Sequence, residues 1–389
     1  MAANNARTTP RRVLEVCLSA SWGGLEMYPG RIAPHLQKRG WEVYGLTLRG
    51  ARVEEALRRH GCNVKTFRSR WLSLLNIWQV LSYIRRNDIH IVHCHKSSDM
   101  QIGALVVLFR PDIRLFFTDH MGVKKPKSDW YHRWVYNKTA RVFSISKATY
   151  QWNRYSLPVT KKKLTQLYYG VDLEAYTAPL ADQKVRQIRA DLGIRPGAVA
   201  IVLPGRIDRS KGHHIWLDAL RELSNKEGLP DWQGIILGGV DPQDAHSSDY
   251  FGELKRFVDN SGLDGEVIFG GFRDDLAMCL RGADIACIPS ACEAFGLAVI
   301  ESMASGCAVV GSASGAIPEL LGEDRGLTVE PSDRSAWATA LESLLRDQRK
   351  RNSLSSNGAA WVRENFSMDT HVNRLTDYYL GISGCESRE

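Results

Sequence analysis

The sequence predicts an α/β protein built from two domains, each with a parallel, doubly wound sheet. The chain has 389 residues, which exceeds the size of a typical single hydrophobic core. In both halves, short β-rich runs alternate with segments of helical periodicity, which is the pattern of parallel sheets with crossover helices. Each half also opens with a strand, a glycine-containing turn and a helix, as Rossmann-like domains do.

The first half supplies the elements of an amino-terminal Rossmann-like domain, assigned to residues 1–175. Short runs rich in apolar and β-branched residues are predicted to be strands at 12–19, 42–48, 63–67, 89–94, 114–118, 140–145 and 164–168. Segments with apolar residues at helical spacing are predicted to be helices at 25–38, 53–60, 74–86 and 98–109.

The second half repeats the scheme over residues 176–365. Its predicted strands are 199–203, 234–237, 266–269, 284–289, 307–311 and 327–329. Its predicted helices are 212–226, 249–261, 274–282, 296–305, 332–347 and 350–365. The change of domain is expected at 172–182, around Pro179. Residues 366–389 would form a tail and a last helix that can return to the first domain. Two such units facing each other would place the active site in a shared interdomain cleft.

Composition restricts the setting of the protein. The chain is 44% apolar and 24% charged, as soluble globular proteins are. The apolar run 13–20 is interrupted by Glu15, so it is predicted to be a buried strand and not the core of a signal peptide. No segment approaches the roughly 20 apolar residues of a spanning helix. We therefore expect a cytoplasmic protein.

The charge is unevenly divided between the two halves. Residues 1–175 carry 29 Lys and Arg against 12 Asp and Glu, whereas the remainder carries 22 against 31. This asymmetry predicts an anionic partner for the first domain. No recognition helix, zinc finger or RNA-stacking motif accompanies it, so we expect no nucleic acid.

A basic cluster beside aromatic residues points to one such partner. Lys124, Lys125 and Lys127 precede an aromatic-rich stretch at 130–136. This combination suits anionic headgroups or a phosphorylated lipid acceptor, and it would place the protein peripherally on the inner face of the cytoplasmic membrane. A solvated loop followed by a helix whose aromatic side chains pack inside explains it equally well.

Two carboxylates eight positions apart form the first candidate site. Glu293 follows the strand 284–289, and Gly296 opens the helix that carries Glu301. The free N–H groups at the start of a helix are a natural seat for a phosphate. Glu301 is then placed to accept hydrogen bonds from a diol such as a ribose, and Glu293 to reach a second sugar. Taken alone, Glu301 also fits an ordinary amphipathic helix.

A basic turn after strand 199–203 forms the second candidate site. Arg206 and Lys211 stand five positions apart in the loop from Gly205 to Gly212. Arginine supplies a rigid fork of donors and lysine a mobile point charge, which together suit a diphosphate. A solvated basic loop would have the same composition.

In order and spacing, these segments resemble the signature of family 4 retaining glycosyltransferases with the GT-B architecture. The family's E-x₇-E motif matches Glu293 and Glu301, with Phe295, Gly296 and Leu297 in its core. Its G-R-hydrophobic-x-x-x-K-G loop matches residues 205–212. Further similarities lie at 314–319, where S-G-A-I-P-E resembles the family's G-G-x-P-E turn, and at 22–26, where Gly23 and Gly24 resemble the family's glycine loop. At 169–172 the sequence Y-G-V-D resembles the family's N-G-V-D, with Tyr169 in place of the usual Asn.

The resemblance implies roles for these residues. Arg206 and Lys211 would bind the donor diphosphate, which the amides of Gly23 and Gly24 would also face. Glu301 would bind the ribose and Glu293 the transferred sugar, beside the donor-binding Phe295, Gly296 and Leu297. His120, which follows strand 114–118, would be the active-site histidine that bonds the donor sugar and stabilises positive charge at its anomeric carbon. A loop histidine with a local backbone partner is the alternative.

A metal is not expected. His93 and His95 share one face of a predicted strand, but the sequence shows no third ligand beside them. No D-x-D pair for Mg²⁺ is present in a suitable loop. We therefore expect neither metal nor cofactor, with a nucleotide diphosphate-sugar as the donor substrate.

The resemblance implies the reaction as well. It would move a hexose-type sugar, with retention, to a hydroxyl of a lipid-linked or polysaccharide acceptor, as in lipopolysaccharide, O-antigen or capsule assembly. Two alternatives stay open: a nucleotide-sugar epimerase of similar fold, and a non-catalytic subunit that binds a sugar nucleotide or a lipid.

Overall fold

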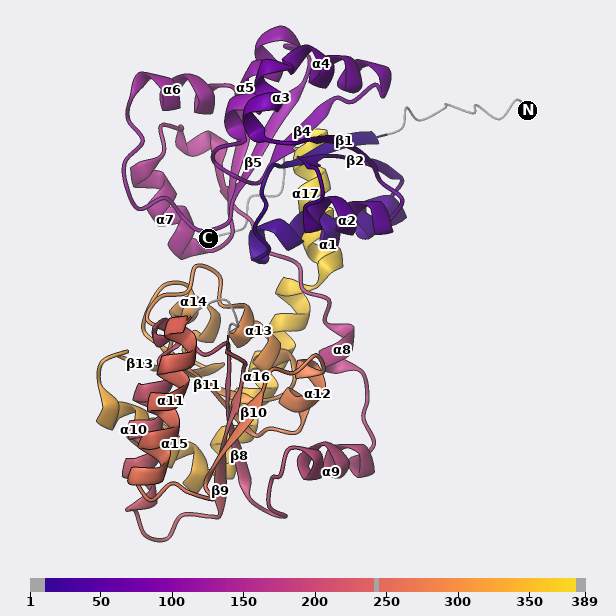
Figure 1. Ribbon diagram of the computed structural model, residues 1–389. Coiled ribbons are helices and arrows are strands. Elements are labelled where there is room, and N and C mark those ends of the chain that lie inside the picture. The colour runs from indigo at the N-terminus through magenta and orange to yellow at the C-terminus, as the bar shows by residue number, and fades with distance from the viewer. Residues whose placement is uncertain (1–10, 241–244, 383–389) are drawn as a thin grey trace, which may run out of the picture. The chain divides into compact units, whose positions relative to one another are not determined.

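The computed structural model describes residues 11–240 and 245–382 and divides into two compact units (Figure 1). The first unit contains the described residues up to Gly170 together with those from Met368 onward, and the second is Val171–Ser367. Each unit has one sheet, in which every strand pairing is parallel. The predicted α/β class with two parallel sheets is confirmed. Within the described residues, no helix is both long and apolar enough to cross a bilayer.

The first sheet has seven strands in the order β3-β2-β1-β4-β5-β6-β7. In chain order they are β1 (Arg11–Cys17), β2 (Trp41–Leu48), β3 (Asn63–Phe67), β4 (Ile91–Cys94), β5 (Arg114–Asp119), β6 (Thr139–Ser144) and β7 (Leu164–Gln166). The order reverses between β1 and β4. In open parallel sheets, ligands bind at the carboxyl ends of the strands beside such a reversal.

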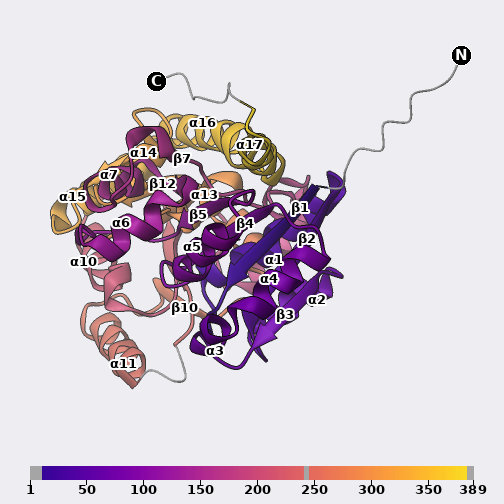
Figure 2. The same ribbon diagram turned by 90° about the horizontal axis from the view of Figure 1, so that it is seen from above.

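Helices cover both faces of this sheet (Figures 1 and 2). They are α1 (Gly24–Lys38), α2 (Arg52–Arg59), α3 (Arg70–Leu75), α4 (Ile77–Arg86), α5 (Met100–Phe109), α6 (Trp130–Asn137), α7 (Lys147–Ser156) and α17 (Met368–Leu380). Side chains alternate along a strand, so Val13 belongs to the core cluster that includes residues of α1, α2 and α17, while Leu14 belongs to the cluster that includes residues of α4, α5 and α6. Burial on both faces explains the continuous apolar runs of the central strands.

The last helix, α17, belongs to the first unit and packs against α1. Its Val372 and Leu375 are fully buried. The Nδ1–H of His371 donates to the carbonyl of Tyr168 at 2.5 Å, and its Nε2 lies 2.7 Å from the hydroxyl of Tyr28. Because a carbonyl can only accept, Nε2 must be the acceptor for Tyr28. Burial lowers the pKa of His371 to about 4, so the imidazole is neutral.

The second sheet has six strands in the order β10-β9-β8-β11-β12-β13. They are β8 (Val199–Pro204), β9 (Trp232–Leu237), β10 (Val267–Gly271), β11 (Ile285–Ile288), β12 (Ala308–Ser312) and β13 (Gly326–Val329). The order reverses between β8 and β11, which are paired. The helices of this unit are α8 (Glu174–Thr177), α9 (Asp182–Asp191), α10 (His213–Ser224), α11 (Ala245–Asn260), α12 (Leu276–Arg281), α13 (Leu297–Ala304), α14 (Ile317–Leu321), α15 (Arg334–Arg346) and α16 (Gln348–Phe366). Trp216 and Trp337 are fully buried in its core.

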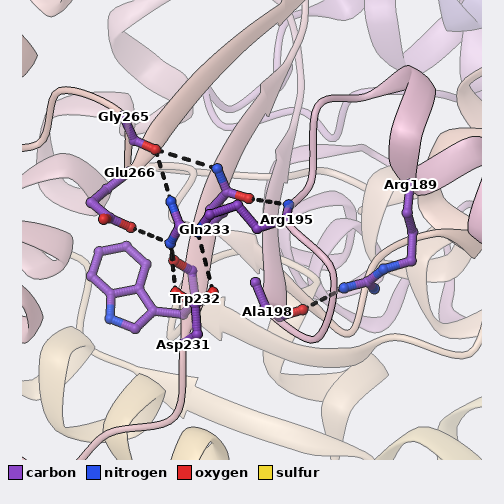
Figure 3. Close-up of polar contacts among 8 residues, drawn as sticks. All are labelled: Arg189, Arg195, Ala198, Asp231, Trp232, Gln233, Gly265 and Glu266. Atoms are coloured by element: carbon purple, nitrogen blue, oxygen red, sulfur yellow. Dashed lines mark hydrogen bonds and ion pairs between the residues drawn. The ribbon is translucent and has the colours of Figure 1, made fainter.

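Polar contacts tie together the amino ends of the strands in the second sheet (Figure 3). Arg195 binds Asp231 at 2.6 Å and Glu266 at 2.8 Å, and its backbone N–H donates to Gln233. Arg189 bridges to the carbonyl of Ala198. These contacts hold β8, β9 and β10 at one end and leave the opposite end for the glycine-rich loops.

The structure contains helices that the sequence analysis did not predict. The expected helix 74–86 begins earlier and breaks in two at Asn76, which ends α3 and begins α4. There the amide Nδ2–H of Asn76 donates to the carbonyl of Leu72 at 2.8 Å. Asparagine side chains that bond nearby carbonyls compete with the helical ladder, which explains the break. The unpredicted helices are α6, α7, α8, α9 and α14.

We predict that His371 makes the stability of the first unit depend on pH. Its folded pKa is about 4 and its ordinary value 6.5, so its contribution is complete above pH 6.5 and is lost as the pH falls toward 4. The difference in free energy of unfolding between the native chain and His371→Leu should shrink by about 3 kcal/mol between pH 7 and pH 4, as denaturant titration would measure. Thr376→Val, a buried change on the same helix that involves no titrating group, is the control: its difference in free energy of unfolding from the native chain should not change with pH. A difference for His371→Leu that also stays constant would contradict the lowered pKa of His371.

Candidate active site

Two loops of the second unit meet at the reversal of its strand order. One follows β8 and contains Arg206 and Lys211; the other follows β11 and contains Glu293. Their strands are paired, so the loops leave the sheet side by side. The N–H of Ala291 donates to the carbonyl of Ser210 at 2.8 Å and joins the loops directly. The structure therefore brings together the two segments that the sequence analysis singled out.

Close backbone contacts fix the position of Glu293. A Cβ at Gly315, where φ is +59°, would lie 2.1 Å from the carbonyl oxygen of Glu293. The N–H of Ala316 donates to this same oxygen at 2.8 Å. At Gly212, where φ is +75°, a Cβ would lie 2.2 Å from the carbonyl oxygen of Pro289. Only glycine tolerates both the positive φ and these approaches.

Lys211 and Glu293 form an ion pair at the centre of the site. The Nζ of Lys211 lies 2.6 Å from the Oε1 of Glu293. The side chains are 28% and 19% exposed, so a ligand can reach both. Partly exposed ion pairs contribute little to stability, about 0–1 kcal/mol. Lys211 can therefore exchange its carboxylate partner for an anionic ligand at small cost.

Glu301 lies on the helix that follows this loop, and Gly296 is the N-cap of that helix. Glu301, on α13, accepts a hydrogen bond from the hydroxyl of Tyr176 at 2.8 Å. Gly296 caps α13 with φ +81°, and the first amides of α13 lack partners within the helix. Phe295 is buried and its ring centroid lies 6.0 Å from that of Phe366, whereas Leu297 is partly exposed. Tyr176 was not predicted, because no local pattern marks it.

Arg206 stands apart from the ion pair. Its side chain is 69% exposed, and its nearest carboxylate, that of Asp208, lies 3.9 Å away. The structure thus joins Lys211 to Glu293 but leaves Arg206 extended from the same loop.

A hollow of about 680 Å³ lies elsewhere in the second unit. Its lining includes Arg189, Asp284, Arg346 and Arg351 and the chain around Val199, at the amino ends of the strands. Ligands of parallel sheets bind at the carboxyl ends, and none of the predicted site residues lines this hollow. We therefore place the candidate site at the loops and not in the hollow.

The glycine loop of the first unit follows β1. Gly23 caps α1, and its N–H donates to the buried carboxylate of Glu26 at 3.0 Å, which also accepts from the hydroxyl of Ser19 at 2.7 Å. A Cβ at Gly24 would meet nothing within 4 Å. The space beside Gly24 is therefore open within this unit.

His120 lies at the carboxyl end of β5 and is 6% exposed. Its Nε2 is 3.2 Å from the Nδ1 of His95, and its ring lies 5.3 Å from the ring of Tyr28 and 5.4 Å from that of Tyr169. Burial, together with the nearby His95 and His371, lowers the pKa of His120 well below its usual range. The imidazole is therefore neutral near pH 7.

A buried polar network continues from His120 into the sheet. The buried polar network consists of Glu15, His93, His95 and His120, together with the hydroxyls of Thr118 and Tyr379. Sequence analysis was wrong that no third potential ligand accompanies His93 and His95, because Glu15 on the adjacent strand β1 lies within reach of both. Glu15 was overlooked because its closeness depends on strand pairing. A charged residue inside an apolar strand was the available signal.

Hydrogen bonds already use both ring nitrogens of His93 and of His95. His93 contacts the hydroxyl of Tyr379 at 2.6 Å through Nδ1 and that of Thr118 at 2.8 Å through Nε2. His95 contacts Glu15 at 2.5 Å through Nε2 and His120 through Nδ1. A metal ion at Glu15, His93 and His95 would have to replace these bonds.

Comparison with known proteins places this arrangement in a family. The model for Glycosyltransferase Family 4 matches residues 22–175, and the model for glycosyl transferases group 1 matches residues 184–361. Together they account for most of the chain and for both parallel-sheet units. The chain belongs to the family 4 glycosyltransferases and has the GT-B fold.

Curated relatives have related activities. The chain is 32% identical over 213 residues to a D-inositol 3-phosphate glycosyltransferase of Corynebacterium kroppenstedtii, covering 54% of this chain and 46% of that relative. It is 27% identical over 322 residues to the lipopolysaccharide core biosynthesis mannosyltransferase LpcC of Rhizobium leguminosarum, covering 81% and 84%. The first match thus spans less than half of the relative.

Solved structures share the fold at low identity. A glycosyltransferase from Rickettsia africae has a TM-score of 0.85 and 19% identity, covering 97% of this chain and 99% of that one. Anabaena HepE, solved in complex with UDP and glucose, has a TM-score of 0.77 and 20% identity, covering 96% and 100%. At such identities the likeness concerns the fold alone.

We predict that Gly315→Ala displaces Glu293 and destabilises the second unit. The new Cβ would clash with the carbonyl of Glu293 in addition to straining a positive φ. Gly262→Ala is the matched control, because φ there is +67° and a Cβ would meet nothing within 4 Å. In thermal denaturation, Gly315→Ala should lower the free energy of unfolding by about 1–3 kcal/mol more than Gly262→Ala does. Equal losses would mean that the close approach is unimportant.

Proposed function

We propose that the chain transfers a hexose-type sugar from a nucleotide diphosphate-sugar to a hydroxyl of a lipid-linked or polysaccharide acceptor, with retention and without a metal. The observation that carries the proposal is the Lys211–Glu293 pair at the carboxyl ends of β8 and β11. The named activity of the Rhizobium relative, in lipopolysaccharide core biosynthesis, supports the acceptor class. The UDP and glucose bound to Anabaena HepE support the donor class.

Departure of the diphosphate is the step that separates charge. Lys211 leaves Glu293 and, with Arg206 and the first amides of α13, offsets the negative charge that develops on the leaving group. Glu293 then accepts hydrogen bonds from the transferred sugar. Glu301 holds the ribose of the nucleotide, beside the hydroxyl of Tyr176. The first amides of α13 are fixed by the helix before the reaction, which is what makes their electrostatic stabilisation effective.

The first unit contributes the remaining groups. His120, which is neutral near pH 7, contacts the donor sugar and stabilises positive charge at the anomeric carbon. By the family resemblance, the amides of Gly23 and Gly24 would bind the diphosphate. The acceptor hydroxyl attacks from the face that the leaving group vacates, which retains the anomeric configuration.

We predict that Lys211→Ala reduces turnover by about 10²–10³, the usual effect of losing one preorganised charge contact. The matched control is Lys226→Ala, because Lys226 forms an equally short ion pair in the same unit, 2.6 Å from Glu342. Sugar transfer from labelled donor, with folding checked by circular dichroism, is the measurement. Near-normal transfer by Lys211→Ala would refute the role.

The donor must be identified first. Thermal-shift screening against UDP, GDP, ADP and their sugars selects it, and proton NMR of the product reports the anomeric configuration. Incubation with donor alone separates the alternatives: an epimerase would isomerise the donor without acceptor. A non-catalytic subunit would bind the donor and leave it unchanged with every acceptor.

We also propose that the first unit docks peripherally on the anionic inner face of the cytoplasmic membrane. Trp71, Leu75 and Trp78, on α3 and α4, are 64%, 77% and 66% exposed. The ring of Phe109, at the end of α5, lies 4.9 Å from that of Trp78. Exposed aromatic and aliphatic side chains of this size are suited to the interface of a bilayer.

The charge around this surface favours anionic lipid. Residues 63–87, which include α3 and α4, contain five basic residues and no acidic one. Basic residues beside interfacial aromatics are attracted to anionic headgroups. The aromatic stretch at 130–136 fits both explanations given for it. Trp130 is 80% exposed, as a membrane contact would be, whereas Tyr136 is buried, as a side chain packed inside would be.

We predict that Trp71→Ser/Trp78→Ser weakens co-sedimentation with vesicles containing anionic lipid at least tenfold, because it removes the apolar contact with the bilayer. Phe272→Ser is the matched control, since Phe272 is 76% exposed in the second unit. Equal binding of the native chain to neutral and anionic vesicles would contradict the electrostatic part of the proposal. Unchanged binding of the double variant would contradict the assigned surface.

A further inference from the structure

The carboxylate of Glu301 has a hydrogen-bond donor from a distant part of the chain. The hydroxyl of Tyr176 donates to the Oε1 of Glu301 at 2.8 Å, although the two residues are 125 positions apart. Both belong to the second unit, Tyr176 to α8 and Glu301 to α13. Both are partly exposed, so a ligand can approach the carboxylate while the bond is in place.

The backbone that carries Tyr176 is anchored. The N–H groups of Tyr176 and Thr177 both donate to the carbonyl of Leu173 at 3.0 Å, and the hydroxyl of Thr177 donates to the same oxygen at 2.9 Å. Leu173 is buried, and α8 packs against α12 and α13. A tyrosine reaches its hydroxyl through only two χ angles. Because the backbone is held and the side chain is stiff, Tyr176 can present its hydroxyl at a defined place.

The side chain of Glu301 gains most from such a partner. A glutamate has several rotatable bonds, and a ligand that orders them has to overcome the lost conformational freedom. The bond from Tyr176 restricts the carboxylate before any ligand arrives, which is the general effect of preorganisation. A carboxylate can accept about four hydrogen bonds on its two oxygens. The bond from Tyr176 is therefore compatible with two more from the hydroxyls of a diol.

A purely structural bond is the competing explanation. In that case Tyr176 only ties α8 to α13, and its loss would weaken every ligand of the site to the same extent. A positioning bond acts through the carboxylate of Glu301. Its loss would weaken only ligands that carry the diol, so the two explanations differ in a measurable way.

We propose that Tyr176 is a positioning residue, which orients the carboxylate of Glu301 toward the ribose diol of the donor and makes the site prefer ribonucleotides over nucleotides that lack the diol. This inference rests on the proposed function, in which Glu301 holds the ribose. Tyr176 acts through Glu301 and does not touch the reacting atoms.

Equilibrium binding to the full chain tests the role. Isothermal titration calorimetry would compare UDP, GDP and ADP with their 2′,3′-dideoxy analogues, and the base that binds most tightly is used from there on. The native chain should prefer the ribose form by about tenfold or more. Tyr176→Phe should bind this form about fivefold more weakly, the scale of one hydrogen bond, and should bind the dideoxy form as the native chain does.

Two further variants separate positioning from structure. In a Glu301→Ala background, Tyr176→Phe should have no additional effect, because the group that it orients is absent. Tyr250→Phe is the matched control: it removes a buried hydroxyl of the same unit, 3.0 Å from the Nδ1 of His214. It should leave the ratio of the two affinities unchanged.

Kinetics provides an independent readout. The ribose is remote from the bond that breaks, so Tyr176→Phe should raise the KM for the donor about fivefold and leave kcat nearly unchanged. A fall in kcat with an unchanged KM would overturn the positioning role.

The inference and the proposed function fail in different ways. If the native chain binds ribose and dideoxy forms equally, the ribose role of Glu301 fails, and the inference fails with it. If the preference is present and disappears in Glu301→Ala but persists in full in Tyr176→Phe, only the role of Tyr176 is overturned. Equal losses of both forms in Tyr176→Phe would show a structural bond and would also overturn the inference.

Discussion

The second unit depends on the close approach of backbone to backbone where its strand order reverses. Parallel pairing of β8 with β11 places their loops next to each other, and glycines at 212 and 315 let the chain pass within contact of Pro289 and Glu293. Side chains at these positions would push the loops apart. The ion pair between Lys211 and Glu293 is therefore a consequence of backbone geometry, and it needs little intrinsic stability of its own.

The first unit satisfies a different constraint, because polar groups lie inside its sheet. Glu15, His93 and His95 are almost completely buried, and each must find partners that replace water. Helix α17 supplies hydrogen-bond partners to this region: Tyr379 contacts His93, and His371 accepts a hydrogen bond from Tyr28. The last helix of the chain thus completes the environment of residues near its beginning. This dependence explains why the helix packs on the first unit.

Local sequence signals predicted the strands well and some helices poorly. Every predicted strand is present, because strands buried on both faces have continuous apolar runs. The helix α6 was missed since its aromatic residues have weak helix propensity, although Asp129 caps it by accepting from the N–H of His132. The break at Asn76 was also missed, because an asparagine inside a periodic segment does not by itself end a helix.

The sequence alone determined the fold class, the two motif loops and the identity of Lys211, Glu293 and Glu301 as a group, because glycines, charges and hydrophobic periodicity are local properties. Tertiary structure decided which of these side chains touch. In the folded chain Lys211 forms an ion pair with Glu293, whereas Arg206 extends from the same loop without joining that pair. The hydroxyl of Tyr176 donates a hydrogen bond to Glu301. Tertiary structure also brought Glu15 to His95, eighty positions away. Such pairings follow from strand order and helix packing, and no spacing along the chain encodes them.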